Sequence, residues 1–144
     1  AGSVSYVFSL NVLEHIPDDL SAVRTIATML KPGGVAYIYV PAFPVLFGPM
    51  DRKVGHVRRY RLGGLRALFR TAGLEVTEGG YADSLGFLAT LAFNALPSRD
   101  GGLSAGPVRA YDRLAFPLSR LGDRLVSRLF GKNAWLVARR PAEG

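Results

Sequence analysis

Two histidines, His15 and His56, are the residues of this chain best suited to proton transfer. An imidazole titrates near neutral pH, so either ring could take a proton from an attacking hydroxyl group. The competing interpretation is that His15 only hydrogen-bonds the backbone of its own turn. Neither histidine has a cysteine or a clustered set of carboxylates near it in the sequence, so we expect no metal site. The histidines are therefore the candidate catalytic residues.

A second group of candidates lies in one basic segment, residues 51–61. Five basic side chains stand there against a single carboxylate, and these residues are Arg52, Lys53, Arg58, Arg59, Arg61 and Asp51. Such a surplus attracts an anion such as a carboxylate or a phosphate, which arginine can bind through two parallel hydrogen bonds. Alternatively, Arg59 and Tyr60 only fix the segment to the next helix, with Asp51 as ion partner. We take Asp51, Arg58, Arg59 and Tyr60 as candidate substrate-binding residues.

A strand–helix–strand unit must position these side chains. Val4–Leu10 is an apolar run short enough for a strand that is covered on both faces. A proline and two aspartates at 17–19 mark the start of an amphipathic helix. Pro32-Gly33-Gly34 ends this helix, and Val35–Val40 is a second buried strand that we expect to lie parallel to the first.

The loops that follow these two strands should meet at one edge of the sheet. Ligands of open parallel sheets bind outside the carboxyl ends of the strands, where such loops converge. Asn11–His15 and Pro41–Tyr60 both leave from that edge. We therefore expect the site to lie between these two loops.

The next segment predicts one helix and one short strand. Leu62, Leu65, Phe69 and Ala72 recur on one helical face that Gly73 closes. Residues 74–77 then alternate as a strand, which we expect to end at Gly79-Gly80.

The C-terminal part predicts further helices and a final strand. Ser84–Leu96 is apolar almost all round and is either a buried helix or a lid over an apolar substrate. Pro97–Pro107 is typical of a connection. Val108–Phe130 carries an apolar stripe and an arginine stripe, which could lie on anionic lipid or cover the sheet with a solvated basic face. Asn133–Arg140 is the last strand.

Composition bounds the class of protein. The chain has 144 residues, 49% of them hydrophobic, a formal net charge of +7 and no cysteine. It can bury the core of one domain, and we expect no disulfide. A signal peptide and an apolar run of about 18 residues are both absent from the given sequence, so we expect a bacterial, cytoplasmic protein. The positive charge alone is weak evidence for a nucleic-acid partner, and the sequence has no aromatic-interleaved basic platform and no zinc pattern, so we expect no such partner.

Several segments together resemble a known family. In chain order these are NVLEHI, LKPGG, VPA, LFGPMD and GHVRRY. From Ser5 to Arg140 the sequence resembles the C-terminal half of a class I S-adenosylmethionine-dependent methyltransferase of the type 11/12 subgroup. The resemblance implies a partial Rossmann-like α/β sheet, with strands like the fourth, fifth, sixth and antiparallel seventh of the family and helices on both faces. The Gly-rich cofactor turn of the family does not precede the NVLEH strand, so we expect residues 1–144 to be one domain cut from a longer enzyme, with a helical insertion at about 82–131.

The resemblance also implies roles for residues. The residues that would line the methionine and methyl part of the S-adenosylmethionine site are Asn11, Val12, Leu13 and Glu14. Glu14 could equally be an acidic residue that interacts favourably with the dipole at a helix N-terminus. The acceptor would be an anionic small molecule or a lipid-linked one, such as a glycan precursor or a quinone-like molecule. We expect this chain to be inactive alone.

A different class of function also fits the sequence. The chain could be a non-catalytic basic module that binds an anionic membrane or a partner protein through the arginine stripe. In either case its first strand would leave an unpaired edge that favours a homodimer.

Overall fold

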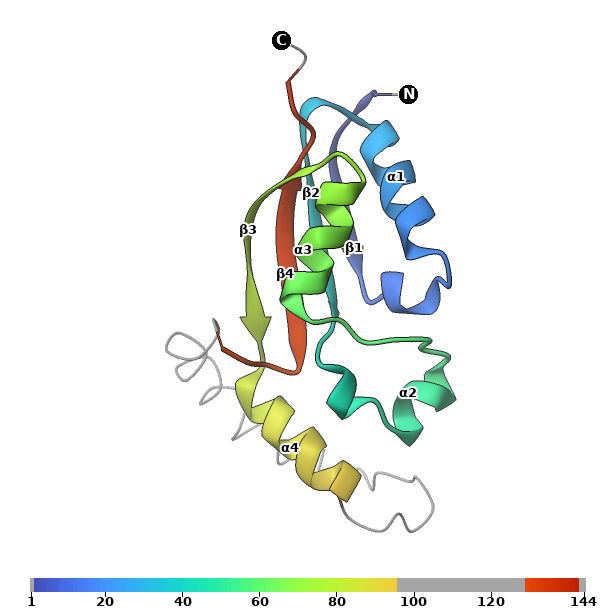
Figure 1. Cartoon of the computed structure of the whole chain (residues 1–144), viewed down its shortest axis with the longest axis vertical. Helices are drawn as coiled ribbons and strands as arrows, with labels where there is room; N and C mark the ends of the chain where they lie inside the picture. The colour runs from blue at the N-terminus through green and yellow to red at the C-terminus, as the bar shows by residue number, and fades with distance from the viewer. Residues whose placement is uncertain (1, 96–128, 143–144) are drawn as a thin grey trace.

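The computed structural model describes residues 2–95 and 129–142 and contains a four-stranded mixed sheet (Figure 1). Its strands are β1 (Val4–Leu10), β2 (Leu30–Pro41), β3 (Glu75–Ala82) and β4 (Asn133–Arg139). Their order across the sheet is β1-β2-β4-β3, with β1 parallel to β2 and β4 antiparallel to both β2 and β3. The predicted α/β class, with an antiparallel last strand, is confirmed.

The described helices cover one face of this sheet and one of its ends, so the expected helices on the opposite face stay a prediction. The described helices are α1 (Asp19–Met29), α2 (Pro49–Val54), α3 (Leu62–Thr71) and α4 (Ser84–Ala95), and the 3₁₀ helices are η1 (Leu13–His15) and η2 (Pro44–Leu46). α1 and α3 lie side by side over one face, whereas α2 and α4 lie beyond the end where β1 and β2 finish (Figure 1). The sequence predicts α1, α3 and α4 but takes α2 for a loop.

The unit from β1 through α1 to β2 is the predicted parallel crossover. Asp18 caps α1 by accepting a backbone hydrogen bond with its carboxylate. α1 ends at Met29, and Leu30 already pairs with Val4 of β1. The segment Pro32-Gly33-Gly34 therefore lies within an irregular start of β2, where a Cβ on Gly34 would lie 3.0 Å from the Val4 carbonyl oxygen.

The core lies between the sheet and the layer formed by α1 and α3. Successive side chains of a strand point to opposite faces of the sheet, so every second residue of a strand enters this core. The buried sheet residues on this face are Ala36, Ile38, Val40, Ala134, Leu136 and Ala138. On the opposite face, Tyr6 and Phe8 are 56% and 67% exposed, and Tyr37 stacks on Trp135 with 6.3 Å between ring centroids. The prediction that the first strand is covered on both faces is therefore wrong for Tyr6 and Phe8.

β3 continues through Gly79 and Gly80, where the sequence predicts its end. A Cβ on Gly79 would lie 3.0 Å from the Trp135 carbonyl oxygen and 3.2 Å from Leu62 Cδ1. A Cβ on Gly80 would lie 3.2 Å from Trp135 Nε1. The absence of side chains at these two glycines allows β4 and α3 to approach β3 closely. Glycine inside a strand can thus mark such a close approach instead of the end of the strand.

We expect Gly79→Ala to lower the free energy of unfolding by about 1–3 kcal/mol, because the added methyl group must displace packed backbone. Gly63→Ala is the matched control, since a Cβ at that position of α3 meets nothing within 4 Å. It should leave stability unchanged or raise it by up to about 1 kcal/mol. Urea unfolding of both variants measures the difference, and equal stabilities would contradict the close approach of the strands.

β1 forms an edge of the sheet and borders a groove. It stands at the end of the strand order, and no strand in the described part of the chain pairs with its outer side. A groove of about 530 Å³ lies between β1 and α1, lined mainly by Val7, Leu10, Val12, Leu13, Ile16 and Ile26. Unpaired strand edges readily accept another strand, which is the reason for predicting a homodimer. The homodimer stays a prediction.

α4 confirms the helix predicted at residues 84–96. The ring of Phe87 packs edge-on against Phe43, with 5.2 Å between centroids. The Asn94 side-chain amide donates a hydrogen bond of 2.9 Å to the Leu46 carbonyl oxygen, so α4 rests on η2. None of the described helices has the length and apolar character needed to cross a bilayer.

The arginine stripe predicted at 108–130 lies outside the described residues, apart from its last two positions. The membrane-binding alternative depends on this stripe and stays a prediction.

Candidate functional site

The candidate site lies where η1 meets the loop after α2. The backbone N–H of Val57 donates to the Glu14 carbonyl oxygen at 2.9 Å and ties the two segments together. Gly55 has a φ of +82°, which ends α2 and turns the chain back toward η1. The ring centroids of His15 and His56 consequently lie 4.7 Å apart. The two loops meet at the carboxyl edge, as predicted.

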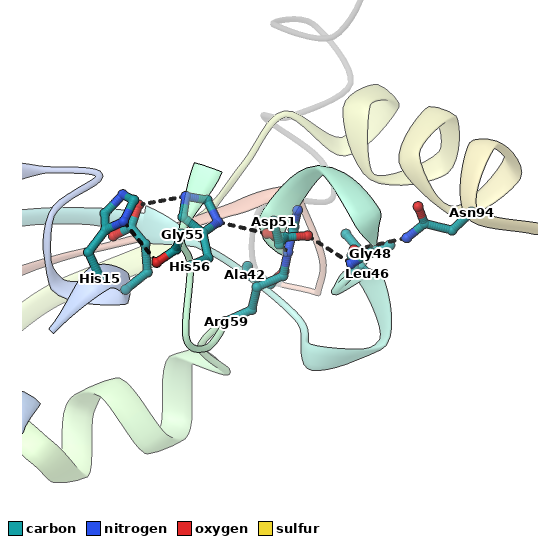
Figure 2. Close-up of polar contacts among 10 residues, drawn as sticks. His15, Ala42, Leu46, Gly48, Asp51, Gly55, His56, Arg59 and Asn94 are labelled. Carbon is teal, nitrogen blue, oxygen red and sulfur yellow. Dashed lines mark hydrogen bonds and ion pairs between the residues drawn. The ribbon is translucent and has the colours of Figure 1, made fainter. Parts of the chain in front are cut away.

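Asp51 is the centre of a buried hydrogen-bond network (Figure 2). Its Oδ1 accepts from Arg59 Nε at 2.8 Å and lies 2.7 Å from His56 Nδ1, while its Oδ2 accepts from the Gly48 N–H at 2.9 Å. Burial would raise the pKa of Asp51, but the hydrogen bonds from Arg59, Gly48 and His56 lower it. Asp51 is therefore an ionised acceptor that holds α2 and the following loop together.

This network fixes the orientation of His56. Because an ionised carboxylate can only accept, the hydrogen between Asp51 and His56 belongs to Nδ1 of the imidazole. The other ring nitrogen, Nε2, faces Glu14 at 3.7 Å from Oε1, which is too long for a hydrogen bond. A ring held in this way presents Nε2 as a base or as a metal ligand.

Glu14 has an unusual environment for a carboxyl group. Its side chain is fully buried, and neither carboxyl oxygen has a hydrogen-bond partner in the part of the chain that the structure describes. Burial raises the pKa of Glu14, against the opposing effects of its own backbone amide and the two nearby histidines. The carboxyl group faces these histidines, a setting that the sequence does not predict.

His15 completes a cluster of possible ligands. Its Nδ1 lies 3.1 Å from the Gly55 carbonyl oxygen, which can only accept, so this nitrogen carries the hydrogen. One nitrogen or oxygen atom from each of Glu14, His15 and His56 lies within 4.8 Å of the others. The sequence gives the histidines no clustered set of carboxylates, and the fold brings one carboxylate, that of Glu14, close to both rings. The expected absence of a metal site stays a prediction.

Arg59, a candidate substrate-binding residue, binds other groups of the chain itself. Its side chain is 7% exposed, and besides Asp51 it donates to the Ala42 carbonyl oxygen at 3.3 Å. This is the structural role that the sequence allows as an alternative. A contact of Arg59 with substrate stays a prediction.

Tyr60 and Arg58 likewise bind groups of the chain itself. The Tyr60 hydroxyl donates to the Leu13 carbonyl oxygen at 3.2 Å and lies 3.0 Å from Asp19 Oδ2. Burial and then the Asp19 carboxylate raise the pKa of Tyr60, which keeps the phenol neutral. Arg58 pairs with Asp19 at 2.7 Å and is 35% exposed, so it retains the most room for a ligand among these candidates.

The four predicted cofactor-binding residues divide into two pairs. Asn11 is exposed and has a φ of +51°, and Val12 is 48% exposed. Leu13 packs in the core, and Glu14 points toward the histidines. Asn11 and Val12 are therefore the pair whose side chains are open to a ligand.

Known proteins resemble this chain in sequence. Residues 1–78 match the family described as a methyltransferase domain. Over 38 residues the chain is 47% identical to a ubiquinone biosynthesis O-methyltransferase of Marinobacter nauticus, and this match covers 26% of the chain and 16% of the relative.

Solved structures share the fold. A Haloferax volcanii methyltransferase in complex with the Trm112 methyltransferase activator is similar with a TM-score of 0.57 and 21% identity, over 99% of this chain and 56% of that one. Phosphoethanolamine N-methyltransferase 2 of Haemonchus contortus, solved with S-adenosyl-L-methionine, gives a TM-score of 0.55 and 20% identity, over 95% of this chain and 33% of that one. The chain thus spans about half or less of the length of these relatives.

Proposed function

Because this chain belongs to the methyltransferase domain family, we propose that, as part of a complete enzyme, it takes part in methyl transfer from S-adenosylmethionine to a small or lipid-linked acceptor. One observation carries the proposal. The matched residues 1–78 include both Asn11–His15 and the basic segment 51–61, and the fold brings these two segments to one edge of the sheet.

The open side chains at the end of β1 fit one end of the cofactor. Val12 offers an apolar contact and Asn11 an amide, which suit the thioether and methionine part of S-adenosylmethionine. Neither residue supplies a carboxylate for the ribose hydroxyls, so the proposal covers only the methyl-donor end. When bound, the cofactor supplies an electrophilic methyl group on its sulfonium, and the protein must mainly align the acceptor with it and exclude water.

The basic segment is proposed to attract the acceptor. Arg52, Lys53 and Arg61 are exposed and Arg58 is half-buried, so the segment keeps positive charge at the surface beside the site. An acceptor with a carboxylate or phosphate would be held there by charge-assisted hydrogen bonds. The names of two similar proteins, an O-methyltransferase of ubiquinone biosynthesis and a phosphoethanolamine N-methyltransferase, support a quinone-like or phosphate-bearing acceptor.

Calorimetric titration of the complete enzyme that contains this chain with S-adenosylhomocysteine tests the placement of the donor. We expect Val12→Asp to weaken the affinity of the protein by roughly tenfold or more, because a carboxylate would replace an apolar contact with the cofactor. Met29→Asp is the matched control, since Met29 is 44% exposed at the far end of α1. Equal affinities of the two variants would contradict the proposed donor site.

A transfer assay tests the acceptor class. The complete enzyme that contains this chain is incubated with methyl-labelled S-adenosylmethionine and either an aqueous or a lipid extract of cells. We expect label in a small or lipid-linked product, with transfer falling when Arg58 and Arg61 are both replaced by glutamine. Label only on protein or nucleic acid would contradict the proposal.

A further inference from the structure

We propose that Glu14, His15 and His56 form a binding site for one divalent transition-metal ion of the zinc class. The inference goes beyond methyl transfer and does not depend on it. It stands on the geometry of three side chains that two separate segments of the chain bring together.

The three donor atoms lie close to the separation that a metal needs. Zinc binds imidazole nitrogen at about 2.0–2.1 Å, so tetrahedral ligands are roughly 3.3 Å apart. His56 Nε2 is 3.7 Å from Glu14 Oε1, and one ring nitrogen of His15 completes a set in which one ligand atom of each residue lies within 4.8 Å of the others. His15 is exposed, so its side chain can close the remaining distance and an ion can enter past it.

Both histidines are already in the tautomer that a metal requires. Nδ1 of His56 donates to the Asp51 carboxylate, and Nδ1 of His15 donates to the Gly55 carbonyl oxygen. Each Nε2 therefore keeps its lone pair in the neutral ring. A metal-bound histidine typically has such a carboxylate or carbonyl partner at its second nitrogen, which fixes the ring and raises its basicity.

The environment of the Glu14 carboxyl group also points to a bound ligand. A fully buried carboxyl group with no hydrogen-bond partner among the described residues is costly in either protonation state. Its Oε1 also faces the imidazole of His56, at 3.7 Å from Nε2. A bound cation would satisfy this carboxylate.

The donor set defines the class of metal. Two imidazoles and one carboxylate suit zinc, cobalt or nickel better than magnesium or calcium, which prefer oxygen ligands. Three protein ligands also leave one position for water or another small ligand. A metal held at Nε2 would occupy the lone pairs that the predicted proton-acceptor role of His15 and His56 requires, so the two roles exclude each other.

The test is titration of the chelator-treated, dialysed chain with Zn²⁺ against a chromogenic chelator, and with Co²⁺ by visible absorption. We expect one equivalent of Zn²⁺ and the intense visible bands of tetrahedral Co²⁺. Glu14→Gln, His15→Asn and His56→Gln should each weaken Zn²⁺ binding at least tenfold. Glu75→Gln, which alters an exposed carboxylate on β3, should bind like the unaltered protein.

Two results would overturn the site. One is the absence of stoichiometric Zn²⁺ binding by the unaltered chain, which would leave Glu14 as a buried neutral acid. The other is binding that His15→Asn and His56→Gln do not weaken. Circular dichroism checks that each variant is folded, and His15→Asn keeps the test decisive because it changes an exposed side chain.

Discussion

Asp51→Ala should lower the free energy of unfolding by about 3–5 kcal/mol, because it leaves a buried guanidinium without its counter-charge. The Arg59 side chain is only 7% exposed, so water cannot replace the lost carboxylate. The Gly48 N–H at the start of α2 and Nδ1 of His56 lose the same acceptor. Urea unfolding followed by circular dichroism measures the change.

The controls separate charge from shape at this position. Asp51→Asn keeps the volume and one acceptor oxygen, so it should cost less than Asp51→Ala. Glu75→Ala removes an exposed carboxylate of β3 and should change stability by no more than about 0.5 kcal/mol. A loss below about 1 kcal/mol for Asp51→Ala would mean that the network of Figure 2 does not hold the loop.

Phe69→Ala should cost a similar amount, about 3–5 kcal/mol, through a different mechanism. Phe69 of α3 has no exposed surface and is among the largest fully buried side chains of the described residues. Its removal opens a cavity between α3 and the sheet, which neighbouring side chains fill only in part.

Phe8→Ala is the matched control for this cavity, since it makes the same chemical change on a ring that is 67% exposed. We expect it to cost less than about 1 kcal/mol, as for surface substitutions. The same unfolding experiment compares the two variants. Similar losses for both would show that the core does not lie between α3 and the sheet.

The sequence predicts the elements of the fold well because their signals are local. An apolar run gives β1, an apolar face closed by Gly73 gives α3, and the capping aspartate starts α1. The wrong element boundaries have a common cause, which is that glycine and proline can end a helix or strand but can also lie within a strand. Gly79 and Gly80 end nothing, because their missing side chains make room for Trp135 across the sheet.

The candidate site could be predicted only in part. That the Asn11–His15 loop and the 41–60 loop share an edge follows from parallel pairing, and the structure agrees. That Glu14 would be buried beside His56 could not be predicted, because the contact depends on the left-handed turn at Gly55 and on α2. The local sequence signal for this turn is Gly55, which stands directly before His56.

The position of β4 bears on how the protein is synthesised. β4 pairs with β2 on one side and β3 on the other, although 50 residues separate it in sequence from the end of β3. During translation at about 5–20 residues per second, β2 and β3 therefore wait roughly 3 to 10 seconds for the strand that joins them. In this interval the edges of β2 and β3 that later face β4 have no partner, which leaves them open to pairing with another strand.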